Sequence, residues 1–188
     1  MNKQELRKEF KEKRKSLSLE EAGRLSELIA GHAIDFLEKH PEFRHIHVFL
    51  PIKKNREVDT FPILEFLEKN GYTIYTSGID AEREEMLTLD ITGIREFEVN
   101  DMGIPDPVSK VLVDPGKVQL VLVPLLVVDS SGHRLGYGKG FYDKFFERIG
   151  RDVFKLGVSF FAPVDQVGSE EHDVALDACV FPEGVVVF

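Results

Sequence analysis

A chain of 188 residues is long enough for one α/β domain with a substantial core. Its net charge of −9 argues against general nucleic-acid binding, and no apolar stretch is long enough to span a bilayer or to act as a signal segment. The single cysteine, Cys179, excludes an internal disulfide bond, and its apolar setting predicts a core position. These features predict a cytoplasmic protein without membrane or nucleic-acid partners.

The beginning of the chain carries an excess of positive charge. Residues 1–15 contain seven basic and three acidic side chains. A helix is predicted over residues 3–16, with Leu6 and Phe10 forming a narrow apolar stripe. The composition alone indicates a solvated helix with charge pairs one turn apart, and the alternative is a cationic arm that closes over an anionic ligand.

A second helix is predicted to begin after the capping-box pattern Ser18-Leu-Glu-Glu21 and to end near residues 40–41. The next apolar segment, HIHVFLP, predicts a short strand that ends at Pro51. His45 and His47 share one face of that strand. Because no third ligand follows nearby, we interpret them as surface or edge histidines rather than as a metal-binding pair.

A polar loop over residues 52–60 follows the first strand, at the strand end where ligands bind in open α/β sheets. It contains Glu57 and Asp59. Either Asp59 or Thr60 is expected to cap the next helix, which has Pro62 in its first turn.

The middle of the chain predicts several short strands. A second strand is expected over residues 72–78, and shorter ones over residues 86–91 and 95–99. Residues 100–116 contain GIPDP and DPG, which predict a proline-rich crossing loop rather than a domain boundary.

Residues 118–143 carry the strongest functional signal. They begin as an almost unbroken apolar run, typical of a strand buried on both faces of a parallel sheet. A basic loop with alternating glycines follows, and then an aromatic helix, FYDKFFERIG. Glycines allow backbone amides to approach an anion closely, and a helix N-terminus favours negative charge. The segment therefore predicts a phosphate or nucleotide site.

The spacing of the loop excludes two common phosphate-binding motifs. The P-loop pattern G-x-x-x-x-G-K-[ST] fails because Lys139 is followed by Gly140 and Phe141. The dinucleotide pattern G-x-G-x-x-G also fails, since the third glycine of Gly136, Gly138 and Gly140 comes too early. The loop is suited to phosphate but belongs to neither class.

The last part of the chain predicts a strand over residues 154–161, a polar segment with Asp173 and Asp177, and an edge strand at residues 185–188. Strands alternate with helices along the sequence. This order predicts an α/β protein: a three-layer α/β/α sandwich with a mostly parallel sheet, in a single domain over residues 1–188.

The loop RLGYGKGFYD, preceded by VP and an apolar strand, resembles that of the 5-formyltetrahydrofolate cyclo-ligase family, also called methenyltetrahydrofolate synthetases. The segments KQELRKEFKEKR, EVDT, GIPDP and HDVALD also resemble the family, in the same order over nearly the full length. Asp106 departs from the usual glutamate, and Phe141 replaces a frequent tyrosine, so no role for a hydroxyl is expected at Phe141.

The resemblance implies an ATP- and magnesium-dependent cyclisation of 5-formyltetrahydrofolate to 5,10-methenyltetrahydrofolate, with release of ADP and phosphate. Phosphorylation of the formyl oxygen would give an imino-phosphate, which the neighbouring folate nitrogen would attack. The protein would act by positioning and charge stabilisation. The implied partners are reduced folate and ATP, and the protein is expected to be a monomer.

The resemblance also implies roles for individual residues. Lys139 and Arg134 would be catalytic, and Asp143 and Asp177 would bind magnesium. The implied ATP site consists of Lys3, Gln4, Glu5, Leu6, Arg7, Arg134, Leu135, Gly136, Tyr137, Gly138, Lys139, Gly140, Phe141 and Tyr142. The implied folate site consists of Arg7, Ile52, Glu57, Tyr137 and Phe141.

Two other functions fit parts of the same pattern. In a sugar-phosphate isomerase on a similar scaffold, Lys139 and Arg134 would bind the substrate phosphate, and no ATP would be needed. A non-catalytic folate- or nucleotide-binding protein would keep the pocket without forming product. ATP-dependent turnover separates all three.

Overall fold

The computed structural model describes residues 2–80, 82–100, 103–150, 152–168, 170 and 173–188. The helices are α1 (Lys3–Ser16), α2 (Leu19–Lys39), α3 (Phe61–Lys69) and α4 (Phe141–Ile149), with short 3-10 helices at Lys53–Asn55 and Pro115–Lys117. The strands of the main sheet are β1 (His45–His47), β2 (Thr73–Asp80), β3 (Glu85–Asp90), β6 (Val111–Leu112), β7 (Leu120–Pro124), β10 (Phe154–Val158), β11 (Ala178–Phe181) and β12 (Gly184–Val187). Two small pairs are formed by β4 (Phe97–Val99) with β5 (Pro105–Pro107) and by β8 (Val127–Val128) with β9 (Arg134–Leu135).

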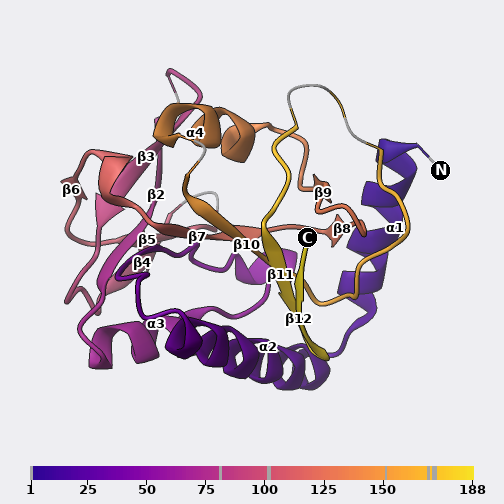
Figure 1. Cartoon of the computed structure of the whole chain (residues 1–188), viewed down its shortest axis with the longest axis horizontal. Coiled ribbons are helices and arrows are strands. Elements are labelled where there is room, and N and C mark those ends of the chain that lie inside the picture. Colours follow the sequence, from indigo (N-terminus) through magenta and orange to yellow (C-terminus); the bar gives the residue numbers. More distant parts are fainter. Residues whose placement is uncertain (1, 81, 101–102, 151, 169, 171–172) are drawn as a thin grey trace.

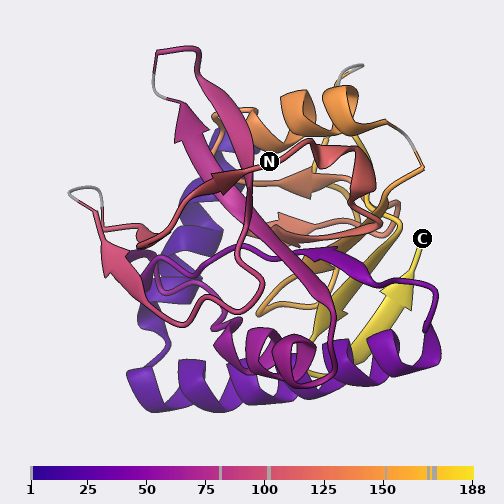
Figure 2. The same ribbon diagram turned by 90° about the vertical axis from the view of Figure 1, so that its left-hand side faces the viewer.

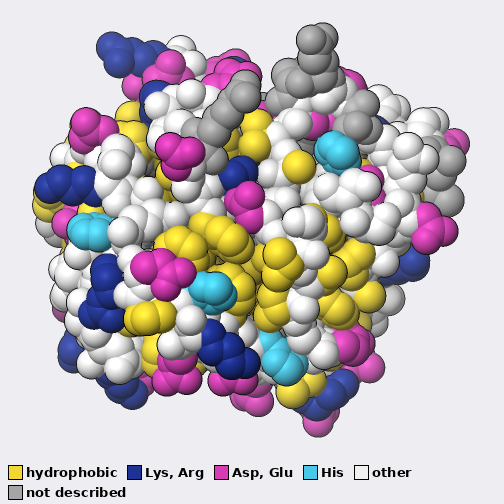
Figure 3. All heavy atoms as spheres, in the orientation of Figure 1, with side chains coloured by type: hydrophobic (Ala, Val, Ile, Leu, Met, Phe, Trp, Pro, Cys, Tyr) yellow, Lys and Arg dark blue, Asp and Glu magenta, His cyan; other side chains and the backbone are white. Residues whose placement is uncertain are grey.

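The main sheet has the order β12-β11-β10-β7-β1-β2-β3-β6. Its five middle strands, from β11 to β2, are parallel, and β12, β3 and β6 are antiparallel additions at the two ends. The prediction of a mostly parallel sheet with a C-terminal edge strand is confirmed. Figure 3 shows hydrophobic side chains gathered over the middle of the face where β12 lies, and Val187 of that strand is 68% exposed.

Helices cover both faces of the sheet. Figure 2 shows α2 and α3 on one face and α4 on the other, so the predicted three-layer arrangement is confirmed. The parallel strands of such a sheet are buried on both faces, and residues of β7 and β10 accordingly lie in the core. α1 packs at the edge against the β8–β9 pair, where Leu6 and Phe10 join a separate apolar cluster (Figure 1).

The starts of the helices follow local sequence signals. The predicted capping box at Ser18 and Glu21 is present, and Asn2 and Glu5 form a second one that opens α1. At α3 the Asp59 carboxylate accepts from the Phe61 amide at 3.0 Å. The N-cap position belongs to Thr60, whose side chain makes no capping hydrogen bond, so Asp59 supplies the side chain that accepts from the first helical amide.

Two predictions about strands were wrong. The apolar run that begins at residue 118 is not one strand: only β7 belongs to the main sheet, while β8 turns away and pairs with β9. The segment over residues 100–116 is not only a loop, because it contains β5 and β6. Its prolines are tolerated in β5 because that strand pairs on one side only, with β4. Positions 101 and 102 lie outside the described residues.

The prediction for His47 was also wrong. β1 is a central strand, so His47 is fully buried rather than at the surface. Its ring packs 5.2 Å from the ring of Phe145, and Nε2 lies 3.1 Å from the Ser77 hydroxyl. Cys179 is a buried core residue, as predicted. Over the described ranges, no helix is long and apolar enough to cross a membrane.

Candidate active site

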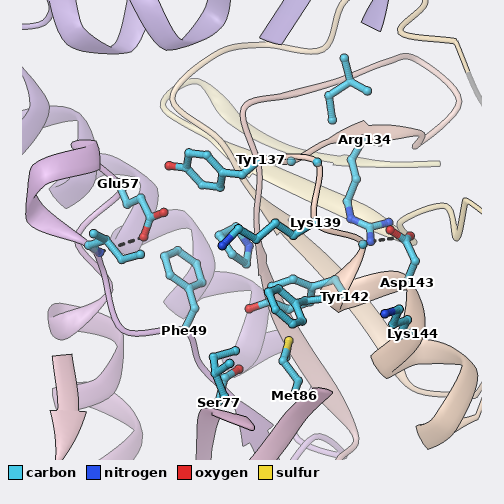
Figure 4. A pocket seen from close by; sticks show the side chains of 18 of the residues that line it. Phe49, Glu57, Ser77, Met86, Arg134, Tyr137, Lys139, Tyr142, Asp143 and Lys144 are labelled. Atoms are coloured by element: carbon cyan, nitrogen blue, oxygen red, sulfur yellow. Dashed lines mark hydrogen bonds and ion pairs between the residues drawn. The ribbon is translucent and has the colours of Figure 1, made fainter. Parts of the chain in front are cut away.

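A cavity of about 800 Å³ opens at the carboxyl ends of the central parallel strands. Phe49 follows β1, Ser77 lies near the end of β2, and Pro124 ends β7. Open parallel sheets bind ligands at this edge, and the volume of the cavity is in the upper part of the range for small-molecule binding sites. Figure 4 shows side chains from the polar loop after β1, from the glycine loop and from α4 facing one another across it.

α1 supplies the cationic side of the cavity. Lys3 and Arg7 lie one turn apart on the helix and both line the cavity. The Lys3 ammonium is 2.9 Å from Glu170 and 2.8 Å from Asp173, and these carboxylates raise its pKa although burial alone lowers it. Arg7 Nε donates to the carbonyl of Gly136 at 3.2 Å. The basic helix is therefore fixed to the glycine loop and to the acidic C-terminal segment.

The backbone of the glycine loop requires glycine at two positions. Gly138 has φ of 94° and Gly140 has φ of 66°, in a region that other residues rarely adopt. A Cβ atom at Gly138 would lie 3.4 Å from Cζ of Arg7. Gly140 is the N-terminal cap residue of α4, and within the described chain no side chain caps this end. The first-turn amides of α4 are thus available to an anion in the cavity.

The two predicted catalytic cations lie in different surroundings. Arg134 has a side chain that is 7% exposed, its Nη2 is 2.8 Å from Asp143, and its Nη1 donates to the Val174 carbonyl. Lys139 is exposed and its side chain extends into the cavity (Figure 4). Lys139 forms no ion pair with any residue that the structure describes. Its ammonium is therefore free to meet a ligand.

Glu57 lies on the opposite wall of the cavity, in the loop after β1. Its Oε2 accepts from the Ile52 amide at 2.8 Å. Burial raises the pKa of the Glu57 carboxyl, while hydrogen bonding by Ile52 and Tyr137 and the charge of Arg14 oppose that rise. Burial and the Glu57 charge also raise the pKa of the Tyr137 and Tyr142 hydroxyls, so both phenols, which lie across the cavity in the glycine loop and α4, remain protonated.

Apolar side chains complete the cavity. Phe49 lies just after β1, Met86 lies in β3, and Ile104 and Pro105 lie where β5 begins. Sequence reasoning did not identify these residues, nor Ser77, Lys144 or Asp173, which also line the cavity. The rule that ligands bind at strand ends could have pointed to Phe49 and Ser77, since both lie at such ends.

Most of the predicted site residues meet in this cavity. Those that line it are Lys3, Arg7, Ile52, Glu57, Arg134, Leu135, Gly136, Tyr137, Gly138, Lys139, Gly140, Phe141, Tyr142 and Asp143. Three predicted ATP-site residues do not line the cavity. Gln4 is exposed, Glu5 caps α1, and Leu6 packs into the apolar cluster between α1 and the β8–β9 pair.

Asp177 is also outside the cavity. It precedes β11, at the amino end of the parallel strands, and its Oδ2 accepts from the backbone and side-chain nitrogens of Lys155 at 2.7 and 2.8 Å. Asp143 lines the cavity but is paired with Arg134. The two carboxylates predicted to bind magnesium are therefore not together, and the described residues contain no group of three potential metal ligands. As a pair, they do not fit a metal centre.

The chain is similar to proteins of known activity. A sequence model of the 5-formyltetrahydrofolate cyclo-ligase family matches residues 1–182. The 5-formyltetrahydrofolate cyclo-ligase of Mycoplasma pneumoniae is 27% identical over 184 residues, covering 97% of this chain and 100% of the relative. That of Mus musculus is 25% identical over 191 residues, covering 95% and 92%.

The solved structures agree with the sequence relatives. The structure of Aquifex aeolicus 5,10-methenyltetrahydrofolate synthetase matches with a TM-score of 0.83 and 29% identity, over 100% of this chain and 93% of that one. The Mycoplasma pneumoniae synthetase matches with a TM-score of 0.75 and 25% identity, over 96% and 98%. The chain belongs to the 5-formyltetrahydrofolate cyclo-ligase family and is an enzyme of this type.

Proposed function

We propose that the protein uses ATP to convert 5-formyltetrahydrofolate into 5,10-methenyltetrahydrofolate, with release of ADP and phosphate. The observation that carries the proposal is one cavity that joins a cationic glycine loop to an apolar wall with a carboxylate. The first surface suits the phosphates of a nucleotide, and the second suits a flat heterocycle with N–H donors. All of these residues come from one chain, so a monomer is sufficient for the reaction.

The ATP phosphates bind along the glycine loop. Lys139 and the first-turn amides of α4 meet the terminal phosphate, and Arg7 meets the phosphates from the side of α1. Lys3 also lies at this wall, where Glu170 and Asp173 hold it. Fixed amides and cations stabilise the charge that develops on the transferring phosphoryl group without rearranging during the reaction.

The folate ring system binds on the opposite wall. Phe49, Met86 and Phe141 offer flat apolar surfaces to the reduced pterin. The ionised Glu57 carboxylate accepts hydrogen bonds from the ring N–H and the neighbouring amino group, a planar pair of donors. With the pterin held in this way, the formyl group would point towards Lys139, whose side chain extends into the cavity (Figure 4).

The formyl oxygen is a poor leaving group, and phosphorylation changes that. The oxygen attacks the γ-phosphorus of ATP, a P–O bond forms, and ADP leaves. The adjacent folate nitrogen then attacks the formyl carbon, a C–N bond forms, and the C–O bond breaks as phosphate departs. The nitrogen loses its proton. Lys139 stabilises the added negative charge directly, and Arg134, held by Asp143, does so from the cavity wall.

Magnesium enters this proposal as the ion that accompanies ATP. Asp143 is the only one of its two predicted ligands that lines the cavity within the described residues. No step of the mechanism is assigned to the metal, because Asp143 and Asp177 do not form a joint site.

The proposal is tested by mixing the protein with 5-formyltetrahydrofolate, magnesium and ATP and following the near-ultraviolet absorbance of the methenyl product. We expect product only when ATP is present, with one ADP formed per turnover. Product formation without ATP would contradict the proposal. Binding of both ligands without product would favour a non-catalytic binding protein, and turnover of a sugar phosphate alone would favour the isomerase.

A further inference from the structure

Arg14 is a buried cation that the reaction described above does not use. It follows Lys3 and Arg7 along the same side of α1, but its residue is only 3% exposed. Its Nη1 donates to the Tyr137 hydroxyl at 2.8 Å, and its Nη2 donates to the Leu125 carbonyl. The guanidinium also lies 6.0 Å from the centre of the Phe160 ring. Arg14 is thus held rigidly, immediately behind the cavity.

The burial of this charge requires an explanation. Desolvating a guanidinium is costly unless an opposite charge compensates it. Among the described residues, no carboxylate lies within ion-pair distance of Arg14. The charge of Arg14 instead lowers the pKa of the Glu57 carboxyl, which lies on the far side of Tyr137.

Tyr137 connects the two charges. A phenol has one proton to donate. Because the Tyr137 oxygen accepts from Arg14, that proton is free to be donated to Glu57. Figure 4 shows the Tyr137 hydroxyl directed towards the wall that carries Glu57. Arg14, Tyr137 and Glu57 therefore form a chain from the buried face of α1 into the cavity, which we call the Arg14 relay.

We propose that Arg14 is a positioning residue that, through Tyr137, keeps Glu57 as an oriented carboxylate facing the folate. The inference rests on the proposed function, because it assigns the pterin as the ligand of Glu57. A carboxylate offers acceptors to both donors of the pterin edge, whereas a protonated acid would turn a proton towards one of them. The relay thus determines how well the protein binds this class of heterocycle.

The pH dependence of folate binding follows from the groups around Glu57. Arg14 faces it from α1, Asn55 from the short helix after β1, Tyr137 from the glycine loop and Tyr142 from α4. Of these, only Arg14 carries a charge at neutral pH. Burial favours the protonated acid and Arg14 favours the carboxylate, so loss of Arg14 should move the protonation of Glu57 to higher pH.

The decisive experiment compares Arg14→Met with the wild type over a range of pH. We expect the acidic limb of kcat/KM for 5-formyltetrahydrofolate to move up by about one pH unit, a tenfold loss on that limb. The KM for ATP should stay unchanged. Arg14→Lys should restore part of the shift, because it returns the charge.

Phe10→Leu is the matched control, because Phe10 lies one turn before Arg14 on the buried face of α1 and packs on Phe161. It should lower stability without moving the acidic limb. An equal shift in Phe10→Leu, or none in Arg14→Met, would overturn the proposal. If Arg14→Met does not fold, Tyr137→Phe interrupts the relay and should shift the limb in the same direction.

A second measurement separates this inference from the proposed function. Binding of 5-formyltetrahydrofolate, measured by calorimetry across the same pH range, does not need turnover. If the wild type binds folate but forms no product, the proposed function fails, while the relay still predicts weaker binding by Arg14→Met on the acidic side. Identical binding curves for the two proteins, or a wild type that does not bind folate, would reject the relay.

Discussion

At the scale of single residues, Lys139 is the side chain that we propose meets the transferring phosphate. It is exposed, extends into the cavity and has no ion-pair partner in the described chain. Lys139→Ala should lower kcat by about 100-fold or more, because fixed charges of this kind supply several kcal/mol to a transition state. The melting temperature should not change. The control is Lys117→Ala, at an exposed lysine outside the cavity. Near-normal turnover of Lys139→Ala would show that Lys139 has no role in the mechanism.

The two aspartates predicted to bind magnesium should behave differently. Asp143 lines the cavity, so Asp143→Asn should raise the magnesium concentration needed for half-maximal turnover. Asp177 accepts from Lys155 at the other end of the strands. Asp177→Asn should leave the magnesium titration unchanged and cost about 1–2 kcal/mol of stability, because buried Lys155 loses its partner. The opposite pattern would show that the described arrangement of Asp177 is not the active one.

The burial of His47 predicts that the free energy of unfolding depends on pH. Its burial lowers the pKa of the imidazole from 6.5 to about 4 in the folded protein. The unfolded chain therefore binds this proton first as the pH falls, so the free energy of unfolding decreases between pH 6.5 and about 4, by about 3 kcal/mol in total.

Chemical denaturation of the wild type and of His47→Gln over this range tests the prediction. Carboxyl groups titrate in both proteins, so the difference between the two curves isolates His47. The difference should grow as the pH rises from about 4 to 6.5 and stay constant above it. A constant difference at every pH would contradict the buried neutral imidazole.

At the scale of elements, the glycine loop couples α1 to α4. Gly138→Ala would place a methyl group against Arg7 in a backbone region that alanine avoids. We expect a loss of about 1–2 kcal/mol of stability and a higher KM for ATP. Gly23→Ala, in the second turn of α2 with open space around it, should instead be neutral or stabilising. Equal changes in stability and in the KM for ATP in the two variants would show that Gly138 is not required for its backbone conformation.

Local signals predicted the helices well, and long-range pairing limited the prediction of strands. The capping box at Ser18 and the proline in the first turn of α3 mark helix starts within a few residues of sequence. No local sequence signal indicates the break between β7 and β8, because the apolar run continues through it. It arises where the Leu126 amide pairs with the Leu135 carbonyl, nine residues further along the chain.

At the scale of the whole molecule, only part of the cavity could be predicted from the sequence. The glycine loop and the start of α4 are contiguous, so one motif predicted most of that wall. Phe49 follows β1, Ser77 lies in β2 and Met86 lies in β3. They carry no motif of their own, so only the folded sheet brings them to the cavity. His47 and Asp177 were misjudged for the same reason, since strand order decides which residues are central and which end they face.

The proposed mechanism requires the formyl oxygen to be activated by phosphorylation in this cavity. The most direct measurement uses 5-formyltetrahydrofolate with the heavy oxygen isotope in its formyl group and ATP, and analyses the released phosphate by mass spectrometry. Each phosphate should carry one heavy oxygen, because the formyl oxygen leaves with the transferred phosphoryl group. Phosphate without the label, formed together with the methenyl product, would show that the formyl oxygen is not phosphorylated.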